Sequence, residues 1–314
     1  SLCDWSSDVC SSDLHGGMPY DTFTYLYDSL VQPIIDYGAA IWGTQEFACI
    51  NAVQYRASRF FLGVGKYTPN VAVAGDMGWK FSVHKQWLSV TRHWVRMVNL
   101  PGTRVNKRVF LWGLSQSNNW CSRVRKKFND LSMQHLGNVN YQFDPDEVLH
   151  DMDVVLEETM EQLWFAKLQR EEAVRGQGRN KLRTYRLFKK DLGTEHYVKK
   201  VFAPGKRSAL AKFRCGVAPI RLETGRYEGL PEDDRFCPFC NEVESETHVI
   251  LNCELYSDLR VDLLNLAAST LRDFPNLTEN DKLAFLLSEP NICILTAKTC
   301  KDILDRRLCF LRVL

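Results

Sequence analysis

Several hallmarks of common protein classes are missing from this sequence. No apolar run approaches the roughly 20 residues that span a bilayer, and the first residues lack the basic start and apolar centre of a secretory signal. A Walker loop and a G-x-S-x-G elbow are absent, and six of the seven histidines are scattered without a paired nucleophile. These absences argue against a membrane-spanning or secreted protein, a P-loop nucleotidase and a serine hydrolase.

The N-terminal residues need separate treatment. Residues 3–14, CDWSSDVCSSDL, resemble the translation of a short-read sequencing adapter, so we expect residues 1–17 to be an artefactual or disordered tail and the biological start to lie upstream. Without Cys3 and Cys10, nine of the eleven cysteines remain. Their arrangement suits metal binding rather than paired disulfides, which predicts an intracellular protein in the nucleus or cytoplasm.

The most specific motif is the run CPFCNEVESETHVILNC at residues 237–253. Its cysteines and histidine follow the spacing C-x2-C-x7-H-x4-C, which is typical of a zinc knuckle. The predicted ligands are Cys237, Cys240, His248 and Cys253. Four protein ligands leave no open position for water, so the predicted Zn²⁺ is structural rather than catalytic. The alternative is that these residues are unrelated buried thiols and a surface histidine.

Two flanking arginines and one threonine have expected roles at this motif. Three thiolates and one Zn²⁺ sum to a charge of about −1, and Arg235 and Arg260 are placed in the sequence to offset it. Thr247 is a candidate cap for a helix that carries His248 and Cys253.

Charge is distributed unevenly although the whole chain carries only +2. Counting Lys and Arg against Asp and Glu gives −3 for residues 1–174, +12 for residues 175–226 and −7 for residues 228–314. We call residues 175–226 the basic segment. Aromatic residues lie between its charges, a pattern that favours RNA or DNA because cations neutralise phosphates and aromatic rings stack on unpaired bases. The alternative is a solvated helical face with the aromatic side chains turned inward.

The candidate nucleic-acid contacts lie in and directly after the basic segment. We expect six cations to contact phosphate and Tyr227 to stack on a base. The cations are Lys206, Arg207, Lys212, Arg214, Arg221 and Arg226.

Apolar residues recur at helical spacing along most of the chain, which predicts a mainly α fold, a multi-helix scaffold with a small zinc-knuckle module. A stripe over residues 20–42 is interrupted near Pro33, and the longest predicted helix covers residues 147–174. Five regions are expected: the tail at 1–17, a helical region at 18–115, a helical connector at 116–174, the basic segment with the knuckle at 175–275, and truncated C-terminal helices at 276–314.

Several spaced segments between about residues 18 and 275 resemble the C-terminal region of non-LTR (LINE-type) retrotransposon reverse transcriptases. The segments are YLYDSLVQP at 25–33, YG at 37–38, IWG at 41–43, KLRTY at 181–185, RSALAKFR at 207–214 and ETGRY at 223–227, followed by the knuckle, Tyr256 and Arg260. The Cys-to-His gap is longer than in viral nucleocapsid knuckles.

This resemblance implies a parent protein that copies RNA into DNA, with its other reverse transcriptase domains as partners. No aromatic-x-Asp-Asp palm signature occurs here, and Asp233-Asp234 follows Pro231 in a polar loop, so we expect no polymerase activity from this fragment. The first functional hypothesis is a nucleic-acid-binding fragment that grips template RNA or target DNA. The alternatives are a structural or protein-interaction scaffold on the polymerase body and a decayed element without function.

Overall fold

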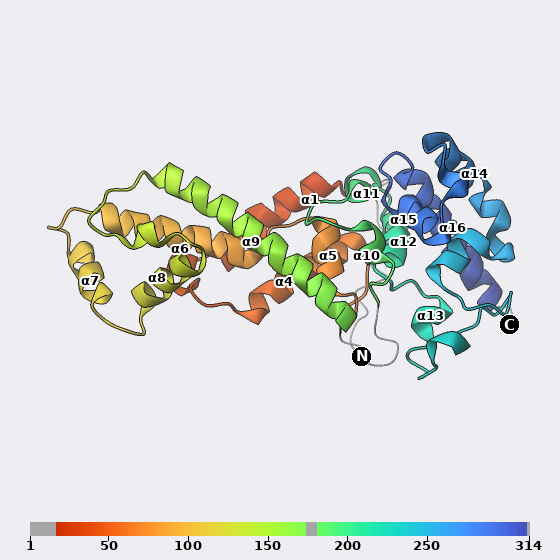
Figure 1. Ribbon diagram of the computed structural model, residues 1–314, viewed down its shortest axis with the longest axis horizontal. Helices are drawn as coiled ribbons and strands as arrows, with labels where there is room; N and C mark the ends of the chain where they lie inside the picture. Colours follow the sequence, from red (N-terminus) through yellow and green to blue (C-terminus); the bar gives the residue numbers. More distant parts are fainter. Residues whose placement is uncertain (1–16, 174–180, 313–314) are drawn as a thin grey trace. The chain divides into compact units, whose positions relative to one another are not determined.

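A computed structural model describes residues 17–173 and 181–312 of the chain (Figure 1). The mainly α fold predicted from the sequence is confirmed, and within these two ranges the only β pairing is an isolated antiparallel bridge between Phe236 and Val243. The expected N-terminal tail lies outside the described residues up to position 16. So do Arg175 and Arg179 at the start of the basic segment.

The first nine α-helices precede the basic segment. They are α1 (Tyr20–Leu26), α2 (Gln32–Ile35), α3 (Ala39–Trp42), α4 (Ala48–Leu62), α5 (Asn70–Met77), α6 (Ser82–Asn99), α7 (Val105–Leu114), α8 (Trp120–Asp130) and α9 (Pro145–Ala173). The predicted interruption near Pro33 is confirmed: a π-helical turn, η1 (Tyr27–Val31), separates α1 from α2, and proline occupies the first turn of α2. Val31 and Gln32 are helical, so Pro33 removes a donor within a continuous helical run, and the turn directly before it is π-helical.

The remaining α-helices lie within or after the basic segment. They are α10 (Tyr185–Phe188), α11 (His196–Lys200), α12 (Pro204–Arg214), α13 (Arg221–Thr224), α14 (Ser257–Thr270), α15 (Glu279–Ser288) and α16 (Cys293–Leu311), with a π-helical turn η4 at His248–Asn252. Single 3-10 turns lie at Gln134–Gly137, Glu232–Asp234, Glu254–Tyr256 and Phe274–Asn276. None of the helices among the described residues combines the length and apolar character needed to cross a membrane.

The chain divides into two compact units. Unit 1 comprises Ser1–Tyr25, Tyr55–Trp79 and Trp164–Leu314, and unit 2 comprises Leu26–Gln54 and Lys80–Leu163. This division differs from the regions expected from the sequence, because residues 18–115 are shared between the units and residues 175–275 join 276–314 in unit 1. The reason is that three of the four dividing points fall inside a helix, namely α1, α4 and α9, where an uninterrupted helical pattern gives no sign of a boundary.

The core of unit 2 is built around Trp94 of α6, which is fully buried. Its indole ring makes edge contacts with Phe110 of α7 and Phe128 of α8 at centroid distances of 5.0 and 5.5 Å. The indole N–H donates to the Leu136 carbonyl oxygen at 2.8 Å, so the one polar atom of this side chain is satisfied. Aromatic packing of this kind orders three helices around one residue.

In unit 1, helix α16 packs against α11, α12, α14 and α15 (Figure 1). A buried polar network joins α5 to α10, α11 and α12. The carboxylate of Asp76 accepts hydrogen bonds from the hydroxyls of Tyr185 and Tyr197, at 3.1 and 2.7 Å, and from the Arg214 guanidinium at 2.9 and 3.1 Å. Gly75 makes room for it, because a Cβ there would lie 2.4 Å from the Tyr185 hydroxyl oxygen.

Candidate metal centre and neighbouring cleft

The four predicted metal ligands come together in unit 1. One ligand atom from each of Cys237, Cys240, His248 and Cys253 lies within 4.8 Å of those of the other three. The Cys253 sulfur is 4.0 Å from that of Cys237 and 3.4 Å from that of Cys240. With metal–sulfur bonds of roughly 2.3 Å, the edge of a tetrahedron is about 3.8 Å. These four residues therefore form a cluster that could hold a metal ion.

Local backbone geometry presents the first two cysteines. Cys237 donates its N–H to the Glu242 carbonyl at 2.6 Å and accepts from the Asn241 N–H at 3.1 Å, which closes a tight turn beside the Phe236–Val243 bridge. Asn241 adopts a left-handed conformation with φ of 56°, which asparagine tolerates better than most residues.

The other two ligands flank a single helical turn. His248 begins η4, and the N–H of Cys253 donates to the His248 carbonyl at 2.7 Å at its end. The expected cap from Thr247 is wrong: its side chain makes no capping bond, and the His248 N–H instead donates to the Ser245 hydroxyl at 3.1 Å. The turn is π-helical, and its i→i+5 hydrogen bond joins His248 to Cys253, five positions further along the chain.

The imidazole of His248 is oriented for metal binding. Its Nδ1 lies 2.9 Å from a carboxylate oxygen of Glu242, which places the proton on Nδ1 and leaves the lone pair on Nε2. The ring is buried, and Nε2 finds no hydrogen-bond partner among the residues that the structure describes. A buried acceptor without a partner is costly, and a cation among the three sulfurs would satisfy it. The donor set therefore fits a metal ion.

Electrostatics at the cluster also favour a bound cation. Burial raises the pKa of the Cys253 thiol to about 12 and raises the pKa of the Cys237 thiol as well. Thiolates at neutral pH therefore need a compensating positive charge. Of the two arginines expected to help, Arg260 is buried and donates to the Cys253 carbonyl. Arg235 instead donates to the carbonyls of Leu222 and Leu230 at 2.8 and 2.7 Å.

The basic segment does not form one continuous exposed surface. Arg214 is fully buried in the Asp76 network, and Arg207, only 4% exposed, donates to the carbonyls of Phe61 and Val201 at 3.0 Å. Neither guanidinium is available to a phosphate in this fold, which corrects the expectation from sequence. Both guanidinium groups instead bind buried carbonyl and carboxylate groups, including some from distant segments of the chain.

The other five candidates have some access to solvent. Lys206 is exposed and Lys212 half-buried on α12. Arg221 pairs with Glu228 at 2.6 Å. Arg226 is half-buried and lies 3.2 Å from Glu223, while Tyr227 is 70% exposed. Only Arg226 and Tyr227 of this set line a wide cleft formed by residues of unit 1.

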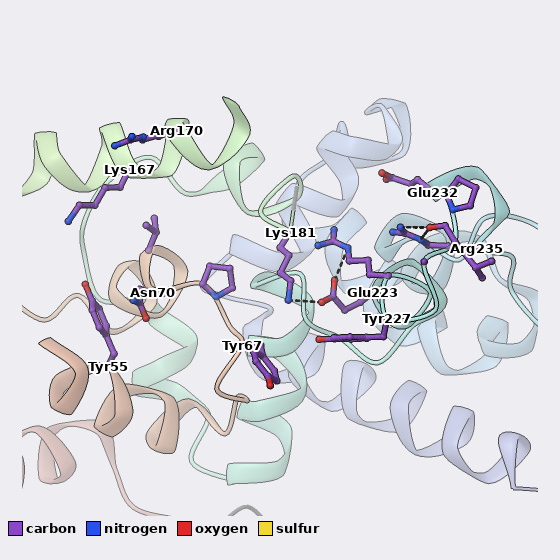
Figure 2. Close-up of a pocket in the computed structure, with 16 residues that line it drawn as sticks. Tyr55, Tyr67, Asn70, Lys167, Arg170, Lys181, Glu223, Tyr227, Glu232 and Arg235 are labelled. Atoms are coloured by element: carbon purple, nitrogen blue, oxygen red, sulfur yellow. Dashed lines mark hydrogen bonds and ion pairs between the residues drawn. The ribbon is translucent and has the colours of Figure 1, made fainter. Parts of the chain in front are cut away.

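That cleft, which we call the tyrosine cleft, has a volume of about 1370 Å³ and lies within unit 1. One wall comes from α4, α5 and the end of α9, with Tyr55, Tyr67, Lys167 and Arg170; the other comes from Lys181 and the region around α13 (Figure 2). Sequence reasoning missed the first wall. Its residues lie outside the basic segment, and only the α9 cations are near it in the chain.

Comparisons with known proteins return no match: no family model, no curated protein and no solved structure is similar to this chain. The site is therefore interpreted from its own geometry.

Proposed function

We propose that this chain is a nucleic-acid-binding module, ordered by Zn²⁺, from the C-terminal region of a LINE-type reverse transcriptase. Template RNA or target DNA would be its ligand, and the other domains of the parent polymerase its partners. In this proposal the chain has no catalytic role of its own. The proposal is supported by the ordered series of segments that resemble that family and by the Cys₃His cluster beside cationic side chains.

Zinc is the ion that this donor set suits best. Three cysteine sulfurs and one imidazole nitrogen are soft or borderline ligands at tetrahedral spacing, whereas Mg²⁺ and Ca²⁺ prefer oxygen. Cys237, Cys240, His248 through Nε2, and Cys253 would hold it, and when bound it supplies cross-linking between the two halves of a short loop. Glu242 would act on the metal indirectly, by fixing the orientation and tautomer of His248.

The observation that carries the proposal is the attachment of α13 to the metal-binding loop. The Leu222 N–H donates to the Glu244 carbonyl at 3.3 Å, and the Arg221 N–H donates to the Glu244 carboxylate. Arg235, directly before the loop, binds the Leu222 carbonyl. A loop ordered by zinc therefore holds the turn that presents Arg226 and Tyr227.

The test is nucleic-acid binding by the full chain with and without metal. Fluorescence anisotropy with labelled single-stranded RNA and with duplex DNA is measured over a salt series, for the zinc-loaded protein and after chelation. We expect affinity that falls with rising salt, since phosphate contacts release counterions, and that falls on chelation. Absence of binding at low salt, or binding insensitive to salt, would refute the proposal.

Matched substitutions separate the metal site from cysteine chemistry in general. Cys237→Ser and His248→Ala should release zinc and weaken nucleic-acid binding, with the helices of unit 2 intact. Cys49→Ser is the control, because Cys49 is an exposed cysteine of unit 2, whereas the cluster belongs to unit 1. Equal loss of binding in the control would remove the link between the metal and the interface.

A second function, a structural or protein-interaction scaffold, is favoured by one observation. Much of the positive charge is neutralised within the chain: Arg183 contacts both carboxylate oxygens of Glu246 at 2.7 Å, and Arg307 lies 2.8 Å from the buried Glu244. Under this alternative no nucleic-acid binding is seen even at low salt, and metal removal loosens unit 1 as a whole.

A further inference from the structure

We propose that the tyrosine cleft binds unpaired nucleotides of a single strand, with tyrosine rings stacking on bases and cations on both walls contacting phosphates. This inference rests on the proposed function and narrows it, since it names the form of nucleic acid and the place where it binds. The tyrosine cleft includes residues outside the basic segment.

The cleft presents aromatic rings from both walls. Tyr227 is 70% exposed and Tyr67 is 67% exposed, and Figure 2 shows Tyr55 and Lys167 pointing toward one another from α4 and α9. The Lys66 ammonium lies 5.0 Å from the centroid of the Tyr67 ring. An exposed ring of this kind stacks on any base, because every base has a π face. Inside a duplex, base pairing and stacking would make the π faces of the bases inaccessible to these tyrosine rings.

Positive charge exceeds negative charge along the cleft. Its lining includes five Lys and Arg side chains and two Glu side chains. Buried Glu223 is shared by two cations, since its carboxylate lies 2.8 Å from Lys181 and 3.2 Å from Arg226 (Figure 2). One carboxylate cannot neutralise both, so a net positive charge is fixed at this wall.

The environment of Arg226 is consistent with an anionic ligand. Burial lowers the pKa of Arg226, Glu223 opposes that effect, and the neighbouring charges of Arg183 and Arg235 lower it further. A phosphate in the cleft would relieve this repulsion. Lys167 and Arg170 on α9 place further positive charge on the opposite wall, where a strand that crosses the cleft would meet it.

The size of the cleft favours more than one nucleotide. At about 1370 Å³ it exceeds the roughly 300–1,000 Å³ of typical small-molecule pockets. Each wall contributes one of the two most exposed rings, Tyr67 and Tyr227, which suits stacking on separate bases of an extended ligand. A single small metabolite would leave much of this lining uncovered.

The test uses the zinc-loaded full chain and three labelled probes: oligo(dT) and oligo(U) strands of about twelve nucleotides, within the usual site size, and a blunt DNA duplex of equal length. Tyr227→Leu should weaken binding of the single strands about tenfold, while Tyr227→Phe retains it. Tyr37→Leu, which replaces a still more exposed tyrosine of unit 2, is the control. Circular dichroism checks that each variant is folded.

A second pair of variants tests the α9 wall. Arg170→Gln should lower the slope of log affinity against log salt by about one for single strands, whereas Arg108→Gln, an exposed arginine on α7, should leave it unchanged. Binding of only oligo(dT) or only oligo(U) supports the cleft and identifies which of these two strands it accepts.

The outcomes separate the two proposals. If Tyr227→Leu and Tyr67→Leu bind single strands like the unaltered chain while Cys237→Ser does not, the cleft proposal is overturned and the proposed function stands. If heparin competes fully and the tyrosine variants have no effect, binding is only electrostatic and the cleft proposal again fails. No binding of any probe at low salt overturns both.

Discussion

Replacing Asp76 with asparagine keeps the shape of the side chain and removes the charge at the centre of the buried network in unit 1. Asp76 is fully buried, and its two oxygens accept four hydrogen bonds from Tyr185, Tyr197 and Arg214. Burial alone would lower the pKa of Arg214, but the carboxylates of Asp76 and Glu195 raise it well above its ordinary value. Arg214 loses its main partner in the variant but keeps its charge, because a guanidinium is not deprotonated in proteins.

The cost follows from these contacts. Removing one partner of a buried ion pair costs about 3–5 kcal/mol. Glu195 remains 2.8 Å from Arg214 and retains part of the attraction. The amide N–H₂ of the new side chain, however, replaces an oxygen that accepted two hydrogen bonds, so it would face two donors. We expect a loss of about 3–4 kcal/mol, a large share of the 5–15 kcal/mol that stabilises a typical domain.

Native-state hydrogen exchange is the suitable assay, because a chain with two units need not unfold in one transition. Protection should fall in α5 and α12, which the network joins, and stay unchanged in α6 and α8 of unit 2. Asp262→Asn on the exposed side of α14 is the control. A loss of less than about 1 kcal/mol for Asp76→Asn would refute the reasoning, because it would mean that Arg214 does not depend on this carboxylate.

Three further predictions follow from the same contacts. Chelating zinc should increase hydrogen exchange in residues 236–256 and in α13 while unit 2 stays protected; uniform loss of protection would contradict a local role for the metal. Arg207→Ala should destabilise unit 1 by about 2–3 kcal/mol, because three hydrogen bonds from a buried guanidinium to carbonyl groups are lost. Lys206→Ala, at an exposed position, should leave the melting temperature unchanged. Equal destabilisation by the two variants would contradict the assignment of Arg207 as buried and Lys206 as exposed. Burial lowers the pKa of His84 below its ordinary value near 6.5, so the folded state favours the neutral imidazole. The stability of unit 2 should therefore fall as the pH drops below about 6.5. Urea unfolding measured over a pH series should show a smaller fall for His84→Gln.

The helices and the metal ligands were largely predictable from sequence, and for a common reason. Helical periodicity is a local property, and α9, at Pro145–Ala173, begins and ends within two residues of the expected range 147–174. The four ligands lie within residues 237–253, so turn geometry alone brings them near one another. The π-helical form of η4 and the role of Ser245 were not predictable, since each depends on atomic detail of one turn.

The fate of the basic segment could not be predicted from its composition. A cationic side chain contributes to a positively charged surface only if it is not bound inside the fold by a distant carboxylate or carbonyl group. Asp76 is 138 positions from Arg214, and the Phe61 carbonyl is 146 positions from Arg207. The same limit applies to the tyrosine cleft, whose Tyr55 and Tyr227 are placed together only by the packing of unit 1.

The sequence by itself thus determined the mainly helical fold and the Cys₃His cluster, because both depend on contacts between residues close together in the chain. Tertiary structure decided which cations are buried, which rings line a common cleft and where the two units divide. Those features depend on contacts between segments more than a hundred residues apart, and no local pattern specifies them.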